Sequence, residues 1–336
     1  MAKGRVVEPR DKPLLDVQHL CKYFPVFAQG LLPRAVGTVR AVDDVSFALM
    51  PGETIGLVGE SGSGKTTTAR SILRALRPTS GKVIFRSNGQ EYDLATLRER
   101  AVRALRVKMQ MVFQDPFSSL NPRMTVGSIV GEPLTIHRIA KSEERRDRVA
   151  RILKRVGLEP DHALRYPHAF SGGQRQRIGI ARALVLEPAL LVADEPVSAL
   201  DVSVQAQILN LLADLQQEFG MTYIFVAHDL SVIRYISDRV AVMYAGRIVE
   251  SAETEVLFED PLHPYTRALL AAVPYPDPDI PLRSQLQGDP ADPASLPPGC
   301  SFHPRCPQCF QDCPQARPEL REERPGHFVA CHLYAK

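Results

Sequence analysis

Short apolar runs recur along the chain and predict buried strands. Residues 54–58, 189–193 and 223–227 are almost wholly apolar, which is typical of strands buried on both faces of a parallel sheet. Each run is followed by sequence compatible with a helix. This alternation of strand and helix predicts a mainly parallel sheet that is covered on both faces.

Further strands are predicted on either side of this core. Residues 14–20 form one, and the alternating pattern of residues 41–49 forms another, with residues 25–40 between them interpreted as a loop or insertion because they carry glycine and proline. Residues 239–244 and 247–250, joined at a glycine, predict a hairpin at the edge of the sheet.

The middle of the chain has a different pattern. Residues 94–157 are helical in pattern and strongly charged, and residues 143–148 read Glu-Glu-Arg-Arg-Asp-Arg. Such a run favours a solvated helix face, with partner binding as the alternative. Beyond residue 274 proline, aspartate and glycine indicate a linker, and a cysteine-rich tail follows from residue 299.

Composition narrows the class of protein. A chain of 336 residues with 44% hydrophobic and 24% charged residues is typical of a globular protein of about two domains. The net charge of +3 is too small to indicate nucleic acid, and it is compatible with a position near an anionic membrane face. No apolar run approaches the ~20 residues of a membrane-spanning helix, and no signal peptide is evident, so we expect a cytoplasmic protein.

A glycine-rich loop carries the clearest chemistry. Residues 59–66 fit G-x-x-x-x-G-K-[ST] and lie between a predicted strand and a predicted helix, as a phosphate-binding loop requires. Lys65 is expected to reach the β- and γ-phosphates of ATP, and the Thr66 hydroxyl to bind Mg²⁺. The residues expected to contact nucleotide here are Gly59, Glu60, Ser61, Gly62, Ser63, Gly64, Lys65, Thr66 and Thr67.

An acidic pair ends the strand at residues 189–193. Asp194 is placed to hold the magnesium shell beside the phosphate loop, and Glu195 to orient or deprotonate an attacking water. Acidic residues after strands also act as plain helix caps, which is the alternative for this pair in isolation.

A third motif points to a family. Ser171, Gly172, Gly173 and Gln174 open a helix, and alone they would be only an N-cap and a flexible joint. Ahead of the acidic pair they resemble the signature motif of ABC-type ATPases, with Phe170 where leucine is commoner. The other family elements have counterparts in order: the Q-loop glutamine Gln114, the D-loop at residues 198–201 with Asp201, the switch histidine His228, and the adenine-stacking aromatic, Phe24 or else Tyr23.

The resemblance implies a fold and a set of roles. The fold is α/β, an ABC-type P-loop NTPase with a mainly parallel sheet core, an antiparallel β edge subdomain, a helical signature subdomain and a Cys-rich C-terminal extension. We expect the nucleotide-binding domain at residues 1–260, its helical subdomain at about 94–185, and the extension at 261–336. Glu195, His228 and Gln114 would be catalytic, and Thr66, Gln114 and Asp194 would hold Mg²⁺.

The family also implies partners. ABC domains pair head to tail, so the signature residues would serve the ATP of a second ATPase subunit, which is either a second copy or a related chain. The segments at residues 263–270, 299–307 and 327–331 are similar to the ATP-binding subunits of bacterial dipeptide and oligopeptide importers. This implies two membrane permease subunits, an indirect link to a peptide-binding protein, no nucleic-acid partner, and a peripheral position on the cytoplasmic face of the inner membrane.

The cysteines suggest a metal centre. Five of the six lie from residue 300 onward, which in a reducing compartment favours metal over disulfides, whereas Cys21 is expected to be a small buried hydrophobe. In the importer branch the cysteines that match Cys300, Cys306, Cys313 and Cys331 are thought to hold an iron–sulfur cluster. A [4Fe–4S] cluster and tetrahedral zinc both suit four thiolates, and Cys309 either replaces a ligand or stays free.

Two alternatives to a peptide importer remain at the level of sequence. Nickel, glutathione and oligosaccharide importers share this branch, because substrate is recognised by other subunits. A non-transport ABC ATPase of DNA repair or translation is the second, but such proteins carry long insertions or two cassettes, and this chain has neither.

Overall fold

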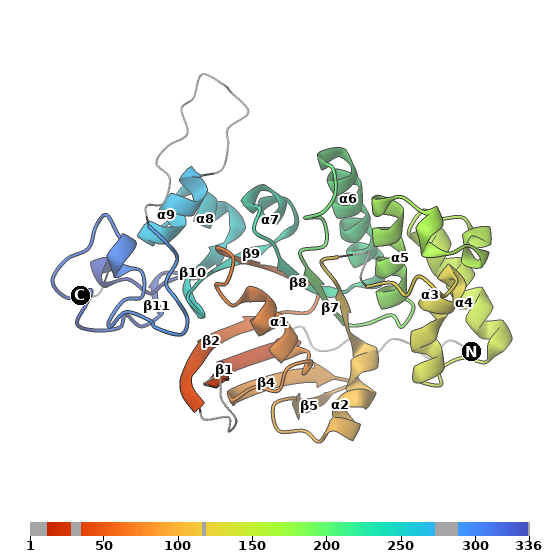
Figure 1. Ribbon diagram of the computed structural model, residues 1–336, viewed down its shortest axis with the longest axis horizontal. Coiled ribbons are helices and arrows are strands. Elements are labelled where there is room, and N and C mark those ends of the chain that lie inside the picture. The colour runs from red at the N-terminus through yellow and green to blue at the C-terminus, as the bar shows by residue number, and fades with distance from the viewer. Residues whose placement is uncertain (1–11, 28–34, 116–118, 273–287, 335–336) are drawn as a thin grey trace. The chain divides into compact units, whose positions relative to one another are not determined.

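The computed structural model describes residues 12–27, 35–115, 119–272 and 288–334. The chain forms two compact units. The first contains residues 1–50, 54–96 and 226–336, and the second contains residues 51–53 and 97–225. Each unit is described by itself below (Figure 1).

The first unit contains a four-stranded antiparallel sheet in the order β2-β1-β4-β5. The prediction of a loop over residues 25–40 is wrong at both ends, because residues 25–27 and 35–40 are strand, while residues 28–34 lie outside the described part. Pairing of β1 with β4 ends at Cys21 and Ser80, so β4 has no residue paired with Pro25. A proline, which has no N–H to donate, is therefore tolerated in this part of β1. The strands are β1 (Leu15–Phe27), β2 (Ala35–Leu49), β4 (Ser80–Ser87) and β5 (Gln90–Asp93).

The same unit contains five strands in the order β11-β12-β10-β9-β3. β3 pairs in parallel with β9. The hairpin β9/β10 is confirmed, but it is not at the edge, because β12 from the tail pairs with the outer side of β10. The strands are β3 (Thr54–Val58), β9 (Arg239–Tyr244), β10 (Arg247–Glu253), β11 (Arg321–Arg324) and β12 (His327–Val329). The helices are α1 (Lys65–Ile72), α7 (Leu230–Ile236), α8 (Thr254–Glu259) and α9 (Pro264–Ala271), with short 3-10 turns at His303–Arg305 and His332–Tyr334.

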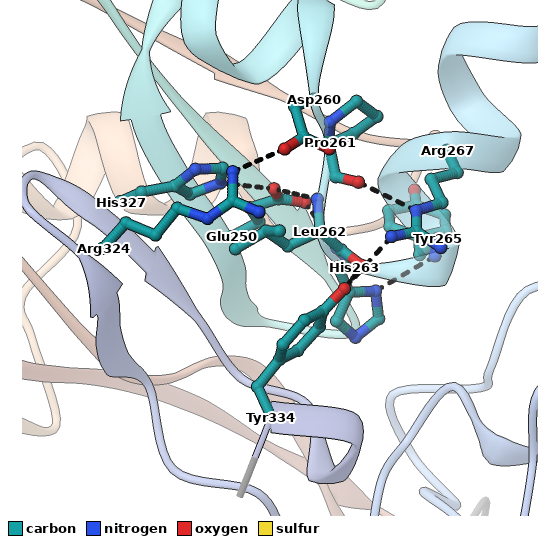
Figure 2. Close-up of polar contacts among 10 residues, drawn as sticks. All are labelled: Glu250, Asp260, Pro261, Leu262, His263, Tyr265, Arg267, Arg324, His327 and Tyr334. Atoms are coloured by element: carbon teal, nitrogen blue, oxygen red, sulfur yellow. Dashed lines mark hydrogen bonds and ion pairs between the residues drawn. The ribbon is translucent and has the colours of Figure 1, made fainter.

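The tail is held to the first unit by buried as well as exposed contacts (Figure 2). His327 reaches Glu250 of β10, and Tyr334 donates to the carbonyl of Leu262. The predicted linker from residue 274 lies outside the described residues as far as residue 287. The tail therefore packs as part of this unit, through contacts between residues far apart in the sequence that local patterns do not reveal.

The second unit has three strands in the order β8-β7-β6 and a group of helices. The predicted strands at β7 (Leu190–Asp194) and β8 (Thr222–Val226) are confirmed, whereas β6 (Met109–Val112) lies in a region predicted to be helical. The charged run is on α4, where Glu143, Glu144, Arg146 and Asp147 are exposed, so the prediction of a solvated helix face is confirmed. The helices are α2 (Glu99–Leu105), α3 (Val126–Ile136), α4 (Ser142–Arg155), α5 (Gly172–Leu184) and α6 (Val202–Phe219), with 3-10 turns at Arg106–Lys108, Pro160–Leu164 and Pro167–Ala169. Among the helices in the described ranges of both units, none is long and apolar enough to cross a membrane.

Candidate nucleotide-binding site

The phosphate loop joins β3 to α1 in the first unit. Gly59, Gly62 and Gly64 have φ values of 146°, 79° and 103°, which L side chains rarely adopt. A Cβ on Gly59 would lie 2.2 Å from the carbonyl oxygen of Met243, and one on Gly64 would lie 2.2 Å from that of Ala41. Glycine is therefore required at both positions by backbone shape and by close packing.

Lys65 lies inside this loop rather than in solvent. Its side chain is buried, and Nζ donates to the carbonyl oxygens of Gly59 at 2.7 Å and Glu60 at 2.9 Å. Thr66 and Thr67 follow in the first turn of α1 and are half-buried. The ammonium group and the N-terminus of α1 together give the loop a positive interior that suits phosphate.

Two contacts to the loop come from residues that sequence patterns did not reveal. The Glu60 N–H donates to the Tyr265 hydroxyl of α9 at 2.9 Å, and Arg305 of the tail makes a double ion pair with the Glu60 carboxylate. Neither residue lies in a nucleotide-binding motif, and their separation from Glu60 in sequence is large. Only the fold brings them together.

In the second unit the structure brings Gln114 and Glu195 into contact. Gln114 follows β6, Glu195 follows β7, and Nε2 of Gln114 donates to Oε2 of Glu195 at 2.8 Å. Glu195 has a φ of 47°, a left-handed conformation that costs on the order of 1–3 kcal/mol for a residue other than glycine. Asp194, just before it at the end of β7, is buried. Strain of this kind is typical of functional sites.

The signature residues form the start of α5. Ser171 is the N-cap: its hydroxyl accepts from the Gln174 N–H at 3.4 Å, and Gln174 Oε1 accepts from the Ser171 N–H at 3.1 Å. A Cβ on Gly173 would lie 2.5 Å from Cγ1 of Val204, so this glycine allows close approach to α6. The N-cap interpretation is thus confirmed as local structure. It also leaves Ser171 exposed at a helix N-terminus.

The remaining candidates are spread over the two units. His228 is exposed and follows β8 in the chain, and Asp201 is the exposed N-cap residue of α6. The Tyr23 hydroxyl donates to Oδ1 of Asp43 at 2.5 Å, and burial together with this bond raises the pKa of Tyr23. Phe24 is half-buried, with Nζ of Lys22 4.7 Å from its ring centroid.

The cysteines give a mixed result. Cys300, Cys306, Cys313 and Cys331 line one small cavity, while Cys309 is exposed and lies outside it. Burial raises the pKa of Cys300 to about 11. Across the described ranges no three His, Cys, Asp or Glu side chains form a group that could hold a metal ion, so the predicted cluster gains no support from geometry. The prediction of a buried Cys21 is wrong: it is half-buried, and its sulfur accepts from the Asp44 N–H.

Comparison with known proteins agrees with this geometry. Residues 42–198 match the family model for ABC transporters, and residues 249–313 match that for the C-terminal region of oligopeptide/dipeptide transporters. The chain is 52% identical to the oligopeptide transport ATP-binding protein AppF of Bacillus subtilis strain 168, over 96% of this chain and 98% of that protein.

Solved structures give the same class. The dimeric ATP-binding cassette MJ0796, in a post-hydrolysis state bound to ADP and Pi, matches with a TM-score of 0.61 and 30% identity over 71% of this chain and 98% of that chain. The structure of cbiO1 from Clostridium perfringens, part of the ABC transporter complex cbiONQ, matches with a TM-score of 0.62 and 28% identity over 74% of this chain and 92% of that chain. The fold and the loops that it carries define an ABC-type ATPase.

Within that class the C-terminal match decides the branch. The chain belongs to the ATP-binding proteins of the oligopeptide/dipeptide branch of ABC transporters.

Proposed function

We propose that this chain is the ATP-hydrolysing motor subunit of a bacterial importer for dipeptides or oligopeptides. The contact between Gln114 and the strained Glu195 carries the proposal for hydrolysis, because it holds a carboxylate ready at the end of β7. The peptide substrate is supported by the relatives, which are named for oligopeptide transport.

The chain's own residues supply the steps of hydrolysis. The backbone of the phosphate loop and Lys65 bind the β- and γ-phosphates, and Glu195 orients the attacking water and accepts its proton. Phe24 stacks on adenine, and His228 contacts the γ-phosphate. Hydroxyl, amide and carboxylate oxygens suit Mg²⁺, so Thr66, Gln114 and Asp194 would hold it, and the ion would neutralise charge on the phosphates.

The signature residues serve a second subunit in this proposal. The chain has one phosphate loop and one signature motif, and Ser171 lies exposed at the start of α5 with donors suited to phosphate. ATP would close a head-to-tail pair with a related ATPase subunit or a second copy, with Asp201 at the contact between subunits. Closure would drive two membrane permease subunits at the cytoplasmic face of the inner membrane.

Reconstitution tests this function. The chain, its partner ATPase, the two membrane subunits and the binding protein in proteoliposomes are expected to hydrolyse ATP faster when a dipeptide or oligopeptide is present, and to accumulate that peptide. Stimulation by nickel, glutathione or an oligosaccharide instead would move the chain to another importer of the branch. Tight, salt-sensitive binding to nucleic acid without any such stimulation would support a non-transport ATPase.

The cysteine cavity carries a second part of the proposal. Cys300, Cys306, Cys313 and Cys331 would bind a structural [4Fe–4S] cluster; this part of the proposal rests on their resemblance to the cysteines of the importer branch, and the four line one small cavity. We expect anaerobically purified protein to absorb at about 400 nm, as iron–sulfur proteins do. Cys313→Ser should abolish this absorbance and Cys21→Ser should retain it. Colourless protein with stoichiometric zinc would overturn the cluster in favour of Zn²⁺.

A further inference from the structure

A double ion pair joins the tail to the phosphate loop. The two terminal nitrogens of Arg305 lie 2.7 and 3.0 Å from the two carboxylate oxygens of Glu60. The Arg305 side chain is only 6% exposed and that of Glu60 is 23% exposed. Bidentate pairs of this geometry are stronger and more directional than single hydrogen bonds, and this one is largely shielded from water.

The tail places Arg305 with buried aromatic rings. Phe302, three residues earlier, is fully buried, and its ring centroid lies 5.3 Å from those of Tyr244 and Tyr265. The guanidinium of Arg305 lies 6.0 Å from the Tyr244 ring centroid. The pair with Glu60 raises the pKa of Arg305, so the guanidinium stays charged. Its position is therefore set by packing as well as by the ion pair.

Glu60 is an unfavourable residue for a loop that binds a polyanion. It is the second residue of the loop, and Lys65 donates to its carbonyl oxygen. An unpaired carboxylate here would repel the phosphates of ATP, because Coulomb repulsion falls only with the inverse of distance. The ion pair cancels that charge, and the Tyr265 hydroxyl fixes the same residue through its N–H.

We propose that Arg305 is a positioning residue for ATP binding: it neutralises Glu60 and holds the first part of the phosphate loop, so the C-terminal extension sets the affinity for the phosphates. This inference rests on the proposed ATPase function. It gives the tail a role at the nucleotide site, in addition to any role of its cysteines.

The test is a set of four variants in full-length protein, titrated with a fluorescent ATP analogue at low salt. Arg305→Ala should raise Kd by about tenfold, because it leaves the Glu60 charge beside the phosphates. Glu60→Gln should lower Kd, since it removes a negative charge and leaves Arg305 near the phosphates. The double variant should return close to the wild-type Kd, and Arg305→Lys should recover part of the affinity without the double contact.

Arg324→Ala is the matched control. Arg324 also joins the tail to the first unit, through Asp260, but this pair does not touch the phosphate loop. Its Kd should equal that of the wild type. The defect of Arg305→Ala should also shrink as ionic strength rises, because salt screens the repulsion. Thermal unfolding of each variant shows that it is folded.

The opposite pattern would overturn the inference. If Glu60→Gln weakens binding as much as Arg305→Ala does and the double variant shows no recovery, the ion pair only stabilises the structure of the loop and does not act by neutralising charge. An unchanged Kd in Arg305→Ala would remove the tail from nucleotide binding altogether. Failure of the wild-type chain to bind the analogue is a different result, since it would contradict the proposed ATPase function itself.

Discussion

Replacement of Glu195 by glutamine is expected to reduce ATP turnover by roughly 10²–10⁴-fold, the usual contribution of a general base, while ATP still binds. Glutamine has nearly the shape of glutamate and keeps an oxygen that can accept the hydrogen bond from Gln114. It cannot take a proton from water. The variant should therefore preserve the resting geometry and lose only the chemical step.

Two measurements separate binding from chemistry in this variant. Phosphate release reports turnover, and size-exclusion chromatography with ATP reports pairing of subunits. We expect a closed pair to accumulate in Glu195→Gln, because ATP that is bound but not hydrolysed keeps the subunits together. The Kd for ATP in the open state should change little.

Glu187 offers a matched control for this experiment. It is another glutamate in a left-handed conformation, with a φ of 50°, and it is exposed in the turn before β7. Glu187→Gln makes the same chemical change on a similar backbone, so turnover should be retained. Undiminished hydrolysis in Glu195→Gln would remove Glu195 from its role as the base.

The features that sequence predicted well are local. The apolar run of β3, the glycines after it and the start of α1 at Lys65 are encoded within a few residues of one another. The N-cap predicted at Ser171 is likewise local, and in the structure it forms a capping box with Gln174, three residues later. Such patterns act through backbone conformation and through hydrogen bonds between residues that are close in the sequence. A short segment is therefore enough to predict them.

The features that were missed depend on contacts between distant segments. β6 has only four residues and gives no clear alternation, so its charged neighbourhood suggested a helix. β12 pairs with β10 across an intervening segment of more than seventy residues, and Arg305 meets Glu60 across an even longer one. Glu195 was assigned its role from its position after an apolar strand, and Gln114 from the family resemblance, but no local pattern predicts that their side chains touch. Tertiary packing decides all of these.

A second large effect is expected at Glu250 of β10, which anchors the tail (Figure 2). Its carboxylate is fully buried and accepts from the N–H groups of Leu262 at 2.7 Å and His263 at 2.9 Å, and it lies 2.7 Å from Nε2 of His327. Glu250→Ala would leave these buried groups without their acceptor. Loss of one partner from a buried, paired charge costs on the order of 3–5 kcal/mol in the free energy of unfolding.

Urea unfolding and limited proteolysis measure this effect. The free energy of unfolding should fall, and new cleavage should appear first in the tail, because β12 and the start of α9 lose their shared anchor. Glu255→Ala is the control: it removes an exposed glutamate that pairs with Arg234 near the same region. That variant should unfold and be cleaved like the wild type. A Glu250→Ala protein that matches Glu255→Ala would show that the buried pair does not hold the tail.

Acid should loosen the same anchor in the wild-type protein. Burial disfavours the charged form of Glu250, but hydrogen bonds from His327 and from the N–H groups of Leu262 and His263 help to lower its pKa. Burial also lowers the pKa of His263 to about 4, and Nδ1 of this neutral ring accepts from the Tyr265 N–H. Both groups bind protons more readily in the unfolded chain, so their stabilisation is present above the unfolded pKa values and is lost as pH falls. We expect tail cleavage to rise as pH falls from about 6.5, the ordinary histidine pKa, towards 4, and pH-independent cleavage over this range would contradict the assignment.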